Sequence, residues 1–152
     1  MTEQDDEKWM AIALAQAEEG AAAGEVPVGA VLVGAAGQEL ARAHNAPRQL
    51  CDPTAHAEVL TLRRAAQRSG AYRLPGSTLY ATLEPCALCL GAALQARVQR
   101  IVFGAFDPKG GAAGSVVDLT NQSALNHRIE TRSGVLEGPC ADVLRTFFAR
   151  RR

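Results

Sequence analysis

Residues 82–89 read Thr82-Leu83-Glu84-Pro85-Cys86-Ala87-Leu88-Cys89 and join a predicted strand (78–83) to a helix predicted to run from the proline to about residue 96. Cys86 and Cys89 are three residues apart, so they share one face of this helix and both sulfurs can reach one ion. The positive end of the helix dipole also favours the thiolate forms that a metal needs. Because redox-active cysteine pairs have the same spacing, this motif alone is weak evidence for a metal.

A second motif reads Asp52-Pro53-Thr54-Ala55-His56-Ala57-Glu58 and is predicted to open a helix to about residue 67, with a capping candidate and a proline in its first turn. His56 and Glu58 then lie on different faces of this turn, so both can serve one site only if it lies off the helix end. Two converging helix N-termini would make such a site from one imidazole, two thiolates and an unattached carboxylate. Three protein ligands leave a fourth position for water, the pattern of catalytic zinc, and the two thiolates cancel the charge of the ion and leave bound hydroxide as a nucleophile.

Each of these residues also has a plainer interpretation. Alone, His56 would more often be a cap or core histidine, and Glu58 would be a solvated residue on a helix face. Cys51 could complete a closed structural site of three cysteines and one histidine, but that arrangement leaves Glu58 without a role. Cys140, in the last predicted helix, is most simply a buried apolar residue.

The rest of the chain predicts alternating strands and helices, with no repeat and no linker. The further expected elements are a helix over 9–19, strands at 26–33, 39–44, 100–104 and 129–132, and an amphipathic helix over 139–152. Residues 105–125 are too rich in glycine for a prediction. This alternation is typical of a three-layer α/β/α domain around a central mixed five-stranded sheet, and a length of 152 residues favours one domain over 1–152.

The composition argues against a disordered or membrane-spanning chain. Apolar residues make up 47% and charged residues 21% of it, which is an ordinary globular balance. The longest apolar stretch, 26–37, is too short and too rich in glycine for a span of ~20 residues. The acidic N-terminus lacks the features of a signal peptide, so we expect a soluble cytoplasmic protein that does not associate with membranes.

The net charge is zero, but the charges are unevenly distributed. Residues 1–40 carry a net charge of −7 and residues 41–152 a net charge of +7, and fourteen of the sixteen basic residues are arginine. Arginine suits phosphate contacts, so the C-terminal part could bind an anionic partner. A solvated helix end is the plainer interpretation of the final Arg150-Arg151-Arg152.

The two motifs together, His-x-Glu followed by Pro-Cys-x-x-Cys, resemble the signature of zinc nucleobase deaminases in the cytidine/deoxycytidylate deaminase superfamily. Within it, the chain most closely resembles the bacterial tRNA-specific adenosine deaminases, over nearly its whole length. The further matching segments are 26–33, Asn45, 102–105, 111–115, 126–128 and Phe147-Phe148. Three positions depart from the family pattern: Leu88, where methionine is usual, Phe106, where a basic residue is common, and Cys51, which adds a thiol close to the site.

The resemblance implies a cytidine deaminase-like fold and a homodimer that acts on a tRNA anticodon stem-loop, with no DNA substrate expected. It implies one Zn²⁺ per chain on His56, Cys86 and Cys89. The implied reaction is hydroxide attack on C6 of the wobble adenosine, chiefly in an arginine tRNA, with Glu58 as the proton shuttle and inosine as the product.

The resemblance also implies substrate contacts. Asn45 would contact the flipped nucleotide, Ala57 would present backbone groups to the base, and Phe147 would belong to an RNA-contacting last helix; without the resemblance, a strand end at a turn explains Asn45 nearly as well. Core packing is the expected role of one of Phe147 and Phe148. Two alternatives stay open: a deaminase of a free nucleobase or nucleoside of the guanine or cytosine type and, more distantly, a non-catalytic structural zinc domain.

Overall fold

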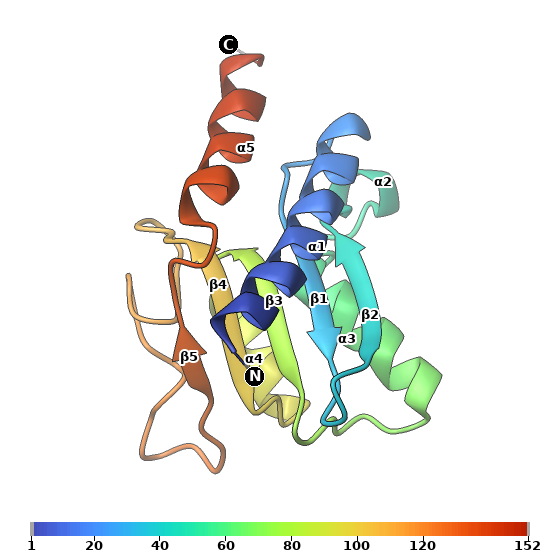
Figure 1. Ribbon diagram of the computed structural model, residues 1–152, viewed down its shortest axis with the longest axis vertical. Helices are drawn as coiled ribbons and strands as arrows, with labels where there is room; N and C mark the ends of the chain where they lie inside the picture. The colour runs from blue at the N-terminus through green and yellow to red at the C-terminus, as the bar shows by residue number, and fades with distance from the viewer. Residues whose placement is uncertain (1, 152) are drawn as a thin grey trace.

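A mixed five-stranded sheet forms the centre of the computed structural model, which describes residues 2–151 (Figure 1). The strands follow the order β2-β1-β3-β4-β5, with bounds β1 Gly29–Val33, β2 Glu39–His44, β3 Thr78–Leu83, β4 Arg100–Ala105 and β5 Glu130–Arg132. β1 pairs antiparallel with β2 and β3, whereas β4 pairs in parallel with β3 and β5. The predicted α/β class and mixed five-stranded sheet are confirmed.

Helices cover both faces of this sheet and make the three predicted layers (Figure 1). Their bounds are α1 Glu3–Ala22, α2 Pro47–Leu50, α3 Ala57–Ser69, α4 Ala87–Gln95 and α5 Glu137–Ala149. Strand side chains alternate between faces, so Val31 and Val33 pack with α1 and α5, while Ala30 and Leu32 pack with α3 and α4. Both faces of β1 are covered, and its five residues are all buried.

The first helix is longer than the apolar pattern predicts. It starts at Glu3 rather than at Trp9, because Thr2 and Asp5 form a capping box. The Thr2 hydroxyl accepts a 3.2 Å bond from the Asp5 N–H, and the Asp5 carboxylate accepts a 3.0 Å bond from the Thr2 N–H. The first turns of α1 are polar, so they lack the apolar periodicity that predicts a helix, and the predicted start falls at residue 9. None of the helices described between residues 2 and 151 is long and apolar enough to cross a membrane.

The start of the second predicted helix is wrong by five residues. Asp52 caps a turn and not a helix, since its Oδ1 accepts hydrogen bonds from the N–H and the hydroxyl of Thr54 at 2.8 and 2.7 Å. α3 begins at Ala57, with His56 as its N-cap residue, and α2 was not predicted. The last helix ends at Ala149; Arg152, which was predicted to belong to it, lies outside the described residues.

A buried ion-pair network fastens α1 to the parallel side of the sheet. Asp6 is fully buried and accepts bonds from Arg100 on β4 at 2.9 and 2.6 Å. Arg132 on β5 and the Tyr80 hydroxyl on β3 also donate to it. Burial alone would raise the pKa of Asp6, but these donors outweigh burial and lower the pKa to about 2.

Candidate metal centre

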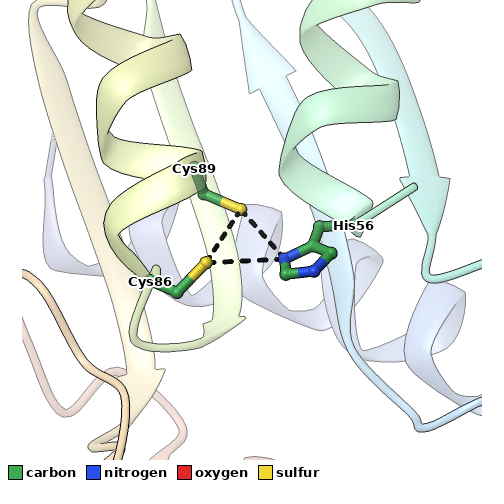
Figure 2. A group of neighbouring side chains, drawn as sticks. All are labelled: His56, Cys86 and Cys89. Carbon is green, nitrogen blue, oxygen red and sulfur yellow. Dashed lines mark hydrogen bonds between the residues drawn. The ribbon is translucent and has the colours of Figure 1, made fainter. Parts of the chain in front are cut away.

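Three candidate metal ligands meet where two helices begin. His56 and Cys86 are the N-cap residues of α3 and α4, and Cys89 lies in the first turn of α4. Figure 2 shows the imidazole and both sulfurs pointing toward one another from these helix ends. Within residues 2–151 this is the one group of at least three His, Cys, Asp or Glu side chains with ligand atoms within 4.8 Å of one another. The predicted convergence of two helix N-termini is confirmed.

The separations within this cluster fit zinc. His56 Nδ1 lies 3.5 Å from Cys86 Sγ and 3.4 Å from Cys89 Sγ, and the two sulfurs are 3.8 Å apart. Tetrahedral zinc holds sulfur at ~2.3 Å and nitrogen at ~2.0–2.1 Å, which places two sulfurs about 3.8 Å apart and sulfur and nitrogen about 3.5 Å apart. Three such protein ligands leave one coordination position open, as in catalytic zinc sites.

Hydrogen bonding favours negative charge on the first of the two sulfurs. The bond between the thiols lowers the pKa of Cys86 to about 5 against the opposing effect of burial, and the backbone N–H groups at the start of α4 lower it further. The same bond, together with burial, raises the pKa of Cys89. A divalent cation between the sulfurs would reverse this second effect, because metal ligation deprotonates a thiol outright.

Glu58 lies beside the ligand cluster and does not belong to it. It is in the first turn of α3 and its exposed fraction is 4%. Burial, and then the neighbouring Cys86 thiolate, raise the pKa of this carboxyl. A raised pKa makes this carboxyl a stronger proton acceptor than an ordinary glutamate, which suits a general acid–base.

Asn45 and Ala57, both expected at the substrate, bond to each other. Asn45 Oδ1 accepts a 2.7 Å hydrogen bond from the N–H of Ala57, the first residue of α3. One backbone donor that a helix start leaves unpaired is thereby satisfied. The Asn45 N–H donates to Val28 O at 3.0 Å. Asn45 therefore caps the N-terminus of α3, the helix that carries Glu58. The nucleotide contacts of Asn45 and Ala57 stay predictions.

A buried carboxylate that the sequence did not single out holds the segment after Asn45. Glu25 is fully buried and accepts bonds from the N–H groups of Arg48 at 3.2 Å and Gln49 at 2.8 Å, at the start of α2. The Arg48 guanidinium also donates to Gly24 O at 3.1 Å. The sequence signal for this role is slight: an acidic residue directly before the apolar stretch that leads into β1.

Glu84, two residues before Cys86, is another such carboxylate. It is 2% exposed and accepts bonds from the N–H groups of Asp107, Ala113 and Ser115, each at 3.1 Å, and from the Ser115 hydroxyl. Burial alone would raise its pKa, but the four donors outweigh burial and lower the pKa. No local spacing could reveal these partners, which lie 23 to 31 residues further along the chain.

The other two cysteines lie outside the metal cluster. Cys51 is exposed at the end of α2, with its thiol 3.8 Å from Arg48 O. The structure therefore contradicts the closed site of three cysteines and one histidine. Cys140 is fully buried, and its sulfur occupies the space that a side chain on Gly104 would need. Its interpretation as a buried apolar residue is confirmed.

The two phenylalanines of α5 differ in exposure. Phe147 is 9% exposed and Phe148 is 47% exposed, so core packing holds for Phe147, as expected for one of the pair. The Arg151 guanidinium lies 4.2 Å from the centroid of the Phe147 ring. A contact between this helix and RNA stays a prediction.

The chain belongs to the family of the cytidine and deoxycytidylate deaminase zinc-binding region, whose model matches residues 3–105. This range contains the metal cluster and Glu58. The protein is therefore a zinc-dependent deaminase, and His56, Cys86 and Cys89 form a group that could hold the metal.

Individual relatives define a narrower group. The tRNA-specific adenosine deaminase of Bacillus subtilis is 47% identical over 94% of this chain and 88% of its own length. That of Haemophilus influenzae is 48% identical over 97% of this chain and 85% of its own length. A solved structure from work on A-to-I editing by tRNA:A34 deaminases at the wobble position of transfer RNA matches with a TM-score of 0.87 and 44% identity, over 90% of this chain and 99% of that one. The resemblance that the motifs indicated is confirmed.

Proposed function

We propose that this protein deaminates adenosine to inosine at the wobble position of a tRNA anticodon, chiefly in an arginine tRNA. The observation that carries the proposal is the cluster of one imidazole and two thiols at the separations of tetrahedral zinc, with the buried Glu58 carboxyl beside it. The relatives support tRNA as the substrate, because the similar proteins of Bacillus subtilis and Haemophilus influenzae are tRNA-specific adenosine deaminases.

In this proposal His56, Cys86 and Cys89 hold one zinc ion per chain. When bound, zinc supplies Lewis acidity and lowers the pKa of a coordinated water from ~9 toward ~7. The starts of α3 and α4 hold the three ligand side chains at the required separations.

Glu58 moves the protons of the reaction. It accepts a proton from water as the oxygen adds to C6 of adenine, and it delivers that proton to N1. It then takes the proton of the new hydroxyl and gives it to the amino group at C6. That group leaves as ammonia, and C6 becomes the carbonyl carbon of inosine. The position of Glu58 outside the ligand cluster suits this exchange.

Asn45, the backbone of Ala57 and helix α5 form the proposed substrate side. Asn45 Oδ1 is bonded to Ala57, so the amide NH₂ of Asn45 is the group left to reach the flipped nucleotide. The Arg151 guanidinium lies over the Phe147 ring, 4.2 Å from its centroid, and in this proposal it contacts RNA phosphates. Bases of an anticodon loop can be splayed out and read on their edges.

We also propose a homodimer that pairs through the face formed by α3 and α4. A groove between these helices is lined by Val59, Leu62 and Leu88, among others. Leu88 and Tyr72 at this groove are 41% and 72% exposed, and contiguous exposed apolar side chains are typical of protein interfaces.

The proposal also includes a single domain over residues 1–152 and a cytoplasmic location. The location follows from the proposed substrate, because the similar proteins are named as tRNA-specific enzymes.

The test is to incubate the purified protein with an unmodified arginine tRNA that carries adenosine at the wobble position, and then to sequence the reverse transcript. We expect an A-to-G change at that position alone, and no change with the Glu58→Gln variant as the control. No change with a wild-type sample that holds one zinc per chain would contradict the proposal. Deamination of free guanine or cytosine by that sample would then favour a free-base deaminase.

A further inference from the structure

Glu84 bonds the segment after β4 to the metal-binding turn. All four hydrogen bonds that this carboxylate accepts come from residues 107–115. The Ala112 N–H also donates to Pro85 O at 2.8 Å, one residue before Cys86. The segment is therefore tied to the chain directly before a metal ligand.

The Glu84 carboxylate fits this segment because both of its oxygens accept hydrogen bonds from it and the backbone at Gly111 packs closely against it. One oxygen accepts the Asp107 N–H and the Ser115 hydroxyl, and the other accepts the N–H groups of Ala113 and Ser115. An amide in place of the carboxylate would turn its NH₂ toward at least one backbone N–H. Gly111 permits the close approach, because a Cβ there would lie 2.3–2.5 Å from the carboxylate atoms.

Exposed apolar side chains flank the anchored segment, residues 107–115, on both sides. Phe106, Val116 and Val117 are 50%, 55% and 48% exposed. The Phe106 ring meets the buried Phe103 ring edge-on, with 5.4 Å between centroids, so its orientation is supported from the core. Exposed rings of this kind suit RNA bases, which stack on aromatic side chains.

We propose that Glu84 is a positioning residue for the RNA substrate. It holds residues 106–117 beside the metal cluster, so that Phe106 and the two valines contact the nucleotides that flank the target adenosine. Glu84 acts through this segment and does not touch the reacting atoms. The inference rests on the proposed function, which supplies the flanking nucleotides.

The test compares Glu84→Gln, Gly111→Ala and the double variant with the wild-type protein. Each single variant should keep one zinc per chain, raise KM for an arginine anticodon stem-loop about tenfold and change kcat less than about threefold. The double variant should raise KM no further, because both changes break the same contact. Glu39→Gln, on β2 and paired with Arg42, is the matched control and should leave both constants unchanged.

An unchanged KM in both single variants, or additive effects in the double variant, would overturn the inference. If Glu84→Gln loses zinc, the KM of Gly111→Ala tests the inference in its place. A wild-type KM in Gly111→Ala would then show that Glu84 serves the metal site alone and would overturn the inference, whereas a raised KM would support it. If the wild-type protein does not edit the wobble adenosine, the proposed function fails. Stem-loop binding measured by fluorescence anisotropy then tests Glu84 separately, and equal affinity of variant and wild type would contradict its role.

Discussion

The two sides of the metal cluster each contain a buried glutamate two residues from a metal ligand, and the two environments are opposite. Glu58 follows His56, and Glu84 precedes Cys86. Their exposed fractions are 4% and 2%. Burial and the Cys86 thiolate raise the pKa of Glu58, whereas four hydrogen-bond donors lower the pKa of Glu84 in spite of its burial.

This contrast shows that burial alone does not assign a role to a carboxylate. Burial penalises the charged form, and each donated hydrogen bond stabilises it, so the sum of the two decides the protonation state. Glu58 has the environment of a group that exchanges a proton. Glu84 has the environment of a permanent acceptor, which suits an anchor for distant backbone.

Loss of a metal ligand should have the largest effect on activity. It also distinguishes the role of the three ligands from the roles of the two glutamates. Cys86→Ala leaves two protein ligands, so we expect it to lose zinc and all turnover, whereas Glu58→Gln and Glu84→Gln keep the metal. Metal analysis of the purified variants measures this. Cys51→Ala is the matched cysteine control, and zinc loss in that variant would restore the closed four-ligand site.

The next effect tests the contrast between the glutamates directly. Glu58→Gln removes the proton carrier with little change in volume, so kcat should fall about 1,000-fold while KM stays within about threefold. Steady-state kinetics on the anticodon stem-loop measure both constants. A raised KM with a preserved kcat, as expected of Glu84→Gln, would make Glu58 a second anchor and remove the contrast.

Asp6 is a third buried carboxylate, and unlike the two glutamates it forms ion pairs with two arginines, Arg100 and Arg132. Asp6→Asn breaks a buried ion pair and should lower the free energy of unfolding by about 3 kcal/mol at neutral pH. Because the folded pKa is about 2 against an ordinary 3.8, the carboxylate stabilises the fold above pH 4 and loses this effect as the pH falls toward 2. The gap between wild type and variant should therefore shrink by roughly 2 kcal/mol between pH 5 and pH 2. Urea unfolding tests this, and a gap that stays constant with pH would exclude the shifted pKa.

The smallest expected effect is on RNA binding, and it comes from replacing the exposed Arg151. Arg151→Ala should weaken stem-loop binding a few-fold and reduce the slope of log affinity against log salt by about one, as expected for one lost phosphate contact. Arg145→Ala is the matched control on α5, where Arg145 pairs with Asp142. Equal salt slopes for the wild-type protein and Arg151→Ala would remove this residue from the interface.

Much of the metal centre could be predicted because its parts are local. The spacing of His56 and Glu58, and that of Cys86 and Cys89, places each pair at a helix start, and the structure brings these starts together. The start of α3 was predicted too early, because Asp52 resembles a helix cap and in fact caps a turn. Competition between such local hydrogen bonds cannot be resolved from residue types alone.

By itself, the sequence determined the five strands of the sheet, the four longer helices, the donor atoms of the metal cluster and the carboxyl beside them, since periodicity and short spacings encode local geometry. Only the tertiary structure decided that Cys51 lies outside the cluster, that Phe147 is buried while Phe148 is exposed, and that Glu84 anchors a distant segment. The reason is physical. Burial and long-range hydrogen bonds depend on which distant segments the fold brings together, and these neighbours set the charge and the role of each side chain.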